Sequence, residues 1–105
     1  MVNKILSATG LPYKESRFIK PPKTTYAIYH DTINRRGGDS INLISQHSIS
    51  IELYEYTKDP EAEKAIEDQL DLLGIEYVKE PRYWLQDEQL YQVVYDFNYH
   101  QKGGN

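Results

Sequence analysis

The sequence predicts an α+β domain, with helices packed on one face of a small antiparallel sheet. Two neighbouring stretches carry this prediction. Residues 48–56 alternate apolar and polar side chains, the period of two that is typical of a half-buried strand. They lead into residues 60–73, where apolar side chains recur every three or four positions, as on the buried face of a helix. One helix packed on an antiparallel sheet is therefore the predicted centre of the fold.

The elements expected before this centre are a short helix, an irregular segment and a long hairpin. Residues 2–9 suit two helical turns, with a glycine directly after them as the stop signal. Residues 11–23 contain three prolines, which remove donors from a sheet, so this segment is expected to be irregular or to lie at a sheet edge. Residues 26–33 and 41–56 are the predicted hairpin strands. The second is expected to bend or to carry a bulge at 46–48, where its apolar pattern lapses.

The central helix has a strong start signal and an acidic outer face. Asp59 can cap the free amides, Pro60 suits the first helical position, and Gly74 ends the helix. The outer face is expected to contact only solvent. It comprises Glu61, Glu63, Lys64, Glu67, Asp68 and Asp71.

After this helix the chain is expected to return to the sheet. Residues 75–78 form a short predicted strand, residues 83–85 lie between two turns, and residues 90–100 have the clearest alternation in the chain. Residues 101–105 are expected to be a flexible tail. The predicted order is α-β-β-α-β-β in a single domain that spans residues 1–105, with no repeat or linker.

Composition argues against several classes of protein. The formal net charge of -4, from 12 basic and 16 acidic residues, argues against a non-specific nucleic-acid binder, which needs a surplus of Lys and Arg. There is no apolar run near the roughly 20 residues that span a bilayer, and no signal peptide is recognisable, so no membrane partner is expected. The chain has no cysteine, which excludes disulfides and thiolate metal sites and favours synthesis in the cytosol.

Tyrosine dominates the aromatic residues, with ten against two phenylalanines and one tryptophan. Its large ring and polar tip suit surfaces that are wet in the free protein and buried in a complex. Tyr29, Tyr54 and Tyr56 are the candidate interface aromatics. The alternative is that tyrosine is used here because it fits strands well.

No pattern in the sequence predicts an enzyme, a metal site or a cofactor site. His30, His47 and His100 stand in separate strand contexts and lack the close spacing of metal ligands. No serine lies in a nucleophile motif such as Gly-x-Ser-x-Gly. Asp87 and Glu88 are acidic groups in a predicted turn, where such residues are common. A hydrolase that uses these carboxylates or a histidine is the weakest of the alternatives.

One loop has residue types that suit recognition. It consists of Arg35, Arg36, Gly37, Gly38 and Asp39, between the two predicted hairpin strands. The glycine pair allows close approach of a partner, and adjacent arginines can bind a carboxylate or a phosphate. The loop lacks the pattern of a phosphate-binding loop and does not stand between a strand and a helix. We treat it as a candidate subunit-interface or channel-facing site; the alternative is an ordinary exposed hairpin tip.

Loose hydrophobic and aromatic patterns recur in a characteristic order over most of the chain. They are Leu11-Pro12-Tyr13, Phe18, Pro21-Pro22, Tyr26–Tyr29, Ile51–Tyr54, Lys58-Asp59, Glu63, Ile66-Glu67, Leu70, Tyr83–Leu85, Glu88, Leu90–Val93 and Tyr95. None is diagnostic alone, but their order resembles that of the tail terminator and tail completion (tail-to-head joining) proteins of siphoviruses of Gram-positive bacteria. The sequence departs from this family around Trp84 and Asp87, so the resemblance defines no contacts there.

The resemblance implies a structural virion protein, without catalytic residues or cofactors, that is assembled in the host cytoplasm and located at the head–tail interface. Its subunits would form a ring, with six as the expected number, at the head-proximal end of the tail. The implied partners are copies of itself, the tail tube protein and the head connector or stopper protein. DNA would pass through the channel without specific binding, and a negative net charge suits a channel that does not hold phosphate.

A second class of function stays open from the residues alone. Small α+β domains also serve as non-enzymatic regulatory modules that bind a ligand or a protein. Self-association distinguishes the two classes, because a large ring in solution favours the structural role.

Overall fold

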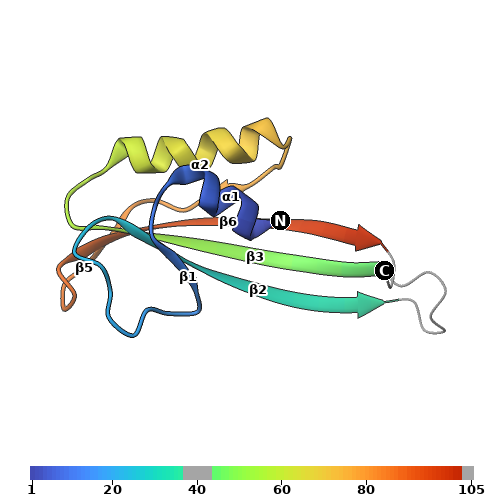
Figure 1. Ribbon diagram of the computed structural model, residues 1–105, viewed down its shortest axis with the longest axis horizontal. Coiled ribbons are helices and arrows are strands. Elements are labelled where there is room, and N and C mark those ends of the chain that lie inside the picture. Colours follow the sequence, from blue (N-terminus) through green and yellow to red (C-terminus); the bar gives the residue numbers. More distant parts are fainter. Residues whose placement is uncertain (37–43, 103–105) are drawn as a thin grey trace.

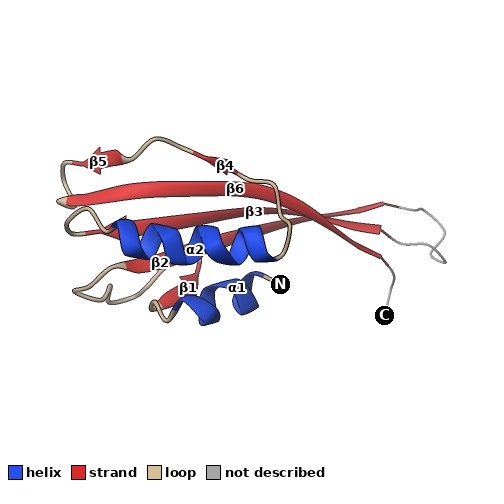
Figure 2. Ribbon diagram, turned by 90° about the horizontal axis from the view of Figure 1, so that it is seen from above, coloured by secondary structure: helices blue, strands red, loops and turns tan. Residues whose placement is uncertain are grey.

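The computed structural model describes residues 1–36 and 44–102, which form one sheet with two helices on one of its faces (Figures 1 and 2). The helices are α1 (Val2–Thr9) and α2 (Pro60–Leu72). The strands are β1 (Tyr13–Glu15), β2 (Tyr26–Arg36), β3 (Ile44–Glu55), β4 (Val78–Lys79), β5 (Tyr83–Leu85) and β6 (Leu90–Lys102). The predicted α+β class, with helices on one face and a long hairpin, is confirmed. Neither helix of the described residues has the length and apolar character that crossing a bilayer requires.

The six strands form a mixed, mostly antiparallel sheet in the order β1-β2-β3-β6-β4, and β5 also pairs with β6. Every pairing is antiparallel except that of β1 with β2. The three long strands pair without a break, so that Tyr29 lies opposite Ile51, and Ile51 lies opposite Tyr95. β1 lies at the edge of the sheet within residues 11–23, as the sheet-edge alternative for this segment predicts. Its bounds could not be predicted, because a three-residue strand is too short to show an alternation.

Several strands differ from their predicted course. β4 shares only Val78 with the predicted strand 75–78, and β2 continues to Arg36, beyond its predicted end at residue 33. The alternative of a bulge in β3 at 46–48 is wrong, since its pairing with both neighbours runs unbroken through these residues. His47 takes an inward position there by stacking on the ring of Tyr99 at 4.4 Å between centroids, and it is only 7% exposed. The last strand, β6, continues to Lys102 and so includes the first two residues of the segment that the sequence indicates as a tail.

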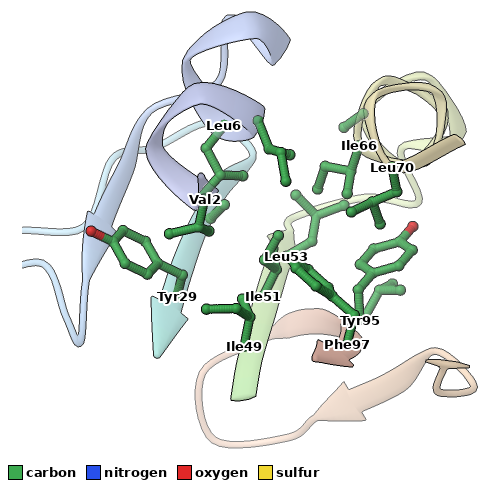
Figure 3. Close-up of a cluster of buried hydrophobic side chains, with 14 residues drawn as sticks. Val2, Leu6, Tyr29, Ile49, Ile51, Leu53, Ile66, Leu70, Tyr95 and Phe97 are labelled. Carbon is green, nitrogen blue, oxygen red and sulfur yellow. The ribbon is translucent and has the colours of Figure 1, made fainter. Parts of the chain in front are cut away.

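The main hydrophobic core lies between the two helices and one face of the sheet (Figure 3). Alternate side chains of a strand point to the same face, so all three long strands contribute apolar side chains to this layer. The strand residues are Ala27, Tyr29, Ile49, Ile51, Leu53, Val93, Tyr95 and Phe97. The helix residues are Val2, Ile5 and Leu6 of α1 with Ala62, Ile66 and Leu70 of α2.

A smaller apolar cluster covers one end of the opposite sheet face. Tyr26, Ile28 and Leu90 are buried there, and Phe18 and Tyr54 pack against them. The ring of Tyr26 stacks on that of Tyr54 at 5.1 Å and meets the edge of Phe18 at 5.3 Å. The irregular segment before β2 therefore closes one end of a face that no helix of the described residues covers.

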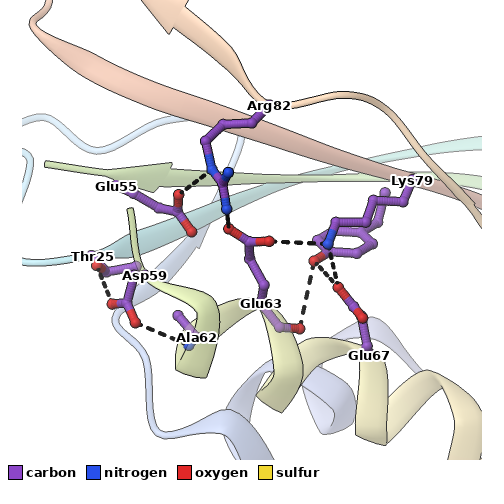
Figure 4. Close-up of polar contacts among 9 residues, drawn as sticks. Thr25, Glu55, Asp59, Ala62, Glu63, Glu67, Lys79 and Arg82 are labelled. Carbon is purple, nitrogen blue, oxygen red and sulfur yellow. Dashed lines mark hydrogen bonds and ion pairs between the residues drawn. The ribbon is translucent and has the colours of Figure 1, made fainter. Parts of the chain in front are cut away.

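Asp59 joins the start of α2 to the chain before β2. Its Oδ1 accepts a hydrogen bond from the backbone N–H of Ala62 at 3.1 Å (Figure 4). Its Oδ2 accepts one from the hydroxyl of Thr25 at 2.7 Å. The predicted cap is confirmed, and it has a second partner far away in the sequence.

We expect Asp59→Ala to lower the free energy of unfolding by about 1–2 kcal/mol, because it removes the cap and leaves Thr25 without its acceptor. Urea denaturation followed by circular dichroism measures this change. Asp71→Ala is the matched control, since Asp71 is an exposed carboxylate near the other end of the same helix. Its removal should alter stability by less than about 0.5 kcal/mol. Equal losses in the two variants would contradict the capping role.

Candidate functional site

The three long strands continue past the helices and project from the rest of the molecule (Figures 1 and 2). This projecting segment consists of residues 32–36 of β2, 44–48 of β3 and 98–102 of β6, which pair row by row. The buried residues of the main core end one row earlier, at Ile49 and Phe97. Among the described residues, no helix covers the projecting segment on either face.

The outer edge of β2 is paired only where β1 lies beside it. The N–H of Ala27 donates to the carbonyl of Pro12 at 2.9 Å. The carbonyl of Tyr29 accepts from the N–H of Ser16 at 3.0 Å. The direction of the backbone N–H and carbonyl groups alternates along a strand. In β2, the odd-numbered residues therefore direct these two groups to the outer edge, away from β3. Beyond β1, three residues of β2 have outward backbone groups that no strand of the described residues pairs with: Asp31, Ile33 and Arg35.

The outer edge of β6 is open in the same way. The N–H of Glu80 donates to the carbonyl of Val94 at 2.9 Å, and Val78 of β4 lies opposite Asp96. In β6, the even-numbered residues therefore direct their backbone N–H and carbonyl groups to the outer edge, away from β3. Beyond Asp96, three such residues are not paired with any strand of the described chain: Asn98, His100 and Lys102.

The helix-side face of the projecting segment begins with an ordered polar contact. The carboxylate oxygens of Asp31 lie 2.9 and 3.1 Å from Nδ1 of His47. The rings of His47 and Tyr99 are nearly parallel, at 8° between their planes. Beside them Ile33 is 45% exposed, a large apolar side chain at an open edge. In this row His47 is buried, whereas Ile33 at the edge is left exposed.

The opposite face of the sheet carries a shallow hollow beside β4, lined by both polar and apolar residues. Its lining includes His30, Ser50, Val78 and Asp96. His30 Nε2 lies 3.4 Å from a carboxylate oxygen of Glu52, so its neighbour is an acid rather than a serine. The hollow has polar side chains but none of the nucleophile–base contacts that hydrolysis requires among its described residues.

An ionic cluster of two buried carboxylates and two partly exposed cations joins α2 to the chain that returns to the sheet (Figure 4). Glu55 at the end of β3 is fully buried, and Glu63 of α2 is 5% exposed. Arg82 bridges them, since its Nε donates to Glu55 at 3.3 Å and its terminal nitrogen donates to Glu63. Lys79 of β4 donates to Glu63 at 3.0 Å and to Glu67 at 2.7 Å. The cluster thereby fixes the returning chain against the helix.

This cluster overturns part of the sequence prediction for α2. Glu63 and Glu67 do not face only solvent, because the returning chain places two cations beside them, and the hydroxyl of Tyr95 also donates to Glu67 at 2.7 Å. One signal could have indicated the cluster. Glu55 follows Leu53 at the next inward position of β3, a charged residue in an apolar series.

The cluster shifts the pKa values of its two buried carboxyl groups in opposite directions. Burial, and then the hydrogen bond and charge of Glu63, raise the pKa of Glu55 to about 7 against the effect of Arg82. Burial also acts to raise the pKa of Glu63, but hydrogen bonds with Glu55, Arg82 and Lys79 outweigh it, so this pKa is lowered. Near pH 7 Glu55 is therefore partly protonated, whereas Glu63 is ionised.

The three candidate interface tyrosines lie in different surroundings. Tyr29 is a core residue, 8% exposed, whose hydroxyl donates to Asn3 at 3.2 Å. Tyr54 is half-buried on the opposite face of the sheet. Tyr56 is 42% exposed, and its hydroxyl donates to the carbonyl of Pro22 at 2.8 Å. Of the three, Tyr56 offers most of its surface to a partner.

Of the candidate loop, the structure describes only the backbone of its first two residues. Arg35 and Arg36 are the last residues of β2. Gly37, Gly38 and Asp39 lie outside the described residues. A role of this loop in subunit contact or in the channel stays a prediction.

The groups considered for catalysis are not brought together. Asp87 and Glu88 are exposed in the turn before β6, whereas His47 lies in the row of Tyr99 near the far end of that strand. In the described parts of the chain, no group of three or more His, Cys, Asp or Glu side chains is placed to hold a metal ion.

Comparison with known proteins identifies the fold but no family. No family model matches the sequence, and no curated protein matches it significantly. Among solved structures, the chain is similar to one from the virion of a native gene transfer agent (GTA) particle. The two chains share 11% sequence identity with a TM-score of 0.64, over 94% of this chain and 84% of the other. At this identity, the likeness establishes a shared fold.

Proposed function

We propose that this protein is a structural component of a phage or phage-like virion and forms a ring at the head-proximal end of the tail. There the ring would end the polymerisation of the tail tube and join the tail to the head connector. The observation that carries the proposal is the shared fold with a chain of a GTA virion, which extends over nearly the whole of both chains. The resemblance of the sequence to tail terminator and tail completion proteins supports the same location.

The architecture supports a structural role. One part of the molecule is a compact body, held by the core and by the buried contacts of Glu55 and Glu63 with Arg82. The other part is a projecting segment whose two outer edges are open among the described residues. A subunit of a ring needs two different contact surfaces, one for each neighbour, and the two edges are candidates for them.

The charge of the chain supports passage of DNA through such a ring without retention. A net charge of -4 disfavours close contact with phosphates, whereas proteins that grip DNA carry clusters of Lys and Arg. The implied partners are the tail tube protein on one side and the head connector or stopper protein on the other.

Deletion of the gene from the phage or element that encodes it tests the proposal. We expect filled heads separated from tails, and tail tubes of irregular and excessive length, because nothing stops polymerisation or joins the two parts. Negative-stain electron microscopy of the lysate measures both features, and gold-labelled antibody on intact particles should mark the junction of head and tail. Complementation with the wild-type gene is the control. Normal particles from the deletion strain, or label elsewhere on the particle, would rule out this function.

A further inference from the structure

We propose that neighbouring copies of this chain join by backbone pairing of the outer edge of β2 in one copy with the outer edge of β6 in the next. The proposal rests on the proposed ring for its occupant, a second copy of the chain. Its structural basis is the presence of two open strand edges on the two sides of one projecting segment.

The two edges match in the backbone groups that they offer. Each has three outward-facing residues beyond its last partner among the described strands, and each residue supplies one N–H and one carbonyl. Open edges of this length are templates for pairing with another chain unless proline, a bulge or a covering element protects them. No proline and no bulge interrupts the paired rows of either edge.

The direction of the strands suits a ring. Both β2 and β6 are antiparallel to β3, so they run in the same direction. A copy related by rotation about an axis roughly along the strands therefore places its β6 parallel to β2 of its neighbour. The contact joins two different edges, so each added copy leaves one edge of each kind open until the ring closes.

The alternation of the backbone sets a favourable register. In a parallel pair, a residue whose backbone N–H and carbonyl point to the neighbouring strand bonds to two residues of that strand. These are the residues directly before and after the one that lies opposite it, as between β1 and β2. Ile33 can bond in this way to Asn98 and His100 of the next copy, with Tyr99 of that copy opposite it. The exposed side chain of Ile33 then lies beside a tyrosine ring, and the helix-covered faces of both copies fall on the same side.

The substitution Ile33→Pro tests the pairing, with Ile33→Thr as its matched control. Proline removes an outward N–H but spares the bonds of β2 with β3, which Thr32 and Asn34 make. We expect wild type and Ile33→Thr to assemble alike in light scattering after size exclusion. Ile33→Pro should need a protein concentration about tenfold higher or more for the same assembly. Equal assembly of the two variants would overturn the proposal.

A cross-linking experiment tests the register and does not depend on the proline variant being folded. The chain has no cysteine, so Thr32→Cys and Asn98→Cys each introduce a single thiol at an exposed position. In the proposed register these residues lie opposite each other on one face, within the distance of a disulfide. Mixing the two variants under mild oxidation should give mixed dimers in excess of either homodimer.

The outcomes separate this proposal from the proposed function. A Thr32→Cys homodimer as the main product would indicate a two-fold contact of β2 with β2 and overturn the pairing of β2 with β6. No cross-link at a protein concentration of about 1 mM would also overturn it, since that concentration captures weak contacts by mass action. Either result leaves the virion role intact if the antibody still marks the junction of head and tail.

Discussion

Replacement of Arg82 by alanine is expected to lower the free energy of unfolding by about 3 kcal/mol at pH 8. The guanidinium of Arg82 donates to Glu55 and Glu63, two carboxylates that the fold buries. Without this guanidinium, the carboxylates of Glu55 and Glu63 lie close together, and only Glu63 keeps a cation, because Lys79 donates to Glu63. Breaking a buried ion pair costs more than the pair contributes when intact, because a desolvated charge is left behind. Urea denaturation measures the loss.

Lys64→Ala is the matched control for this variant. Lys64 also pairs with a carboxylate, that of Asp68, but the two side chains are 73% and 56% exposed. Water screens such a pair, so its loss should change stability far less than the loss of Arg82. A loss for Arg82→Ala no larger than that for Lys64→Ala would show that the cluster is not a structural anchor.

Substitution of glutamine for Glu55 is expected to make the protein more stable at pH 8 and to leave its stability near pH 5 almost unchanged. In the folded protein the pKa of Glu55 is raised to about 7, from an ordinary value of 4.5. The native state therefore binds more protons than the unfolded state between these two values, and stability falls as the pH rises through this window. The lowered pKa of Glu63 acts in the other direction, since its contribution is lost as the pH falls below about 4.5.

Glutamine cannot ionise, yet it keeps an acceptor for Arg82 and a donor for Glu63. The gain at pH 8 should therefore be on the order of 1–3 kcal/mol. Thermal or urea denaturation of both proteins from pH 4.5 to pH 8.5 measures it. Glu61→Gln, at an exposed position of α2, controls for the change in net charge. Parallel pH profiles of wild type and Glu55→Gln would contradict the raised pKa.

The parts of the fold that the sequence predicts are those with local determinants. The alternation in β3 and β6 spans enough residues to define a strand, and Asp59 with Pro60 marks the start of α2 within one residue. The short strands β1 and β4 lack such a pattern, because pairing with β2 and β6 holds them in place. His47 interrupts the apolar series of β3 without interrupting the strand, since aromatic stacking and an acid partner replace hydrophobic contact.

The candidate site depends on relations that no local pattern contains. Arg82 and Glu55 are 27 residues apart in the chain, and only the return of the chain along α2 brings them together. The open edges depend on which strands lie at the outside of the sheet, which is a property of topology. The abundance of tyrosine predicts contact surfaces in general but not which tyrosines form them. Tyr29 lies in the core, and its residue type alone does not distinguish it from a tyrosine at an interface.

The uneven cover of the sheet has a consequence for how stability is distributed along β2, β3 and β6. Near the helices these strands are held by buried side chains, and the row of Ile33 still contains the stacked rings of His47 and Tyr99, whereas beyond that row the strands are held mainly by bonds to one another. Strands with so little buried apolar surface open at a small fraction of the free energy of global unfolding. The part of each strand that would meet a neighbour is therefore the part least stabilised by its own chain, and in an assembled ring its order would come largely from the adjoining copy.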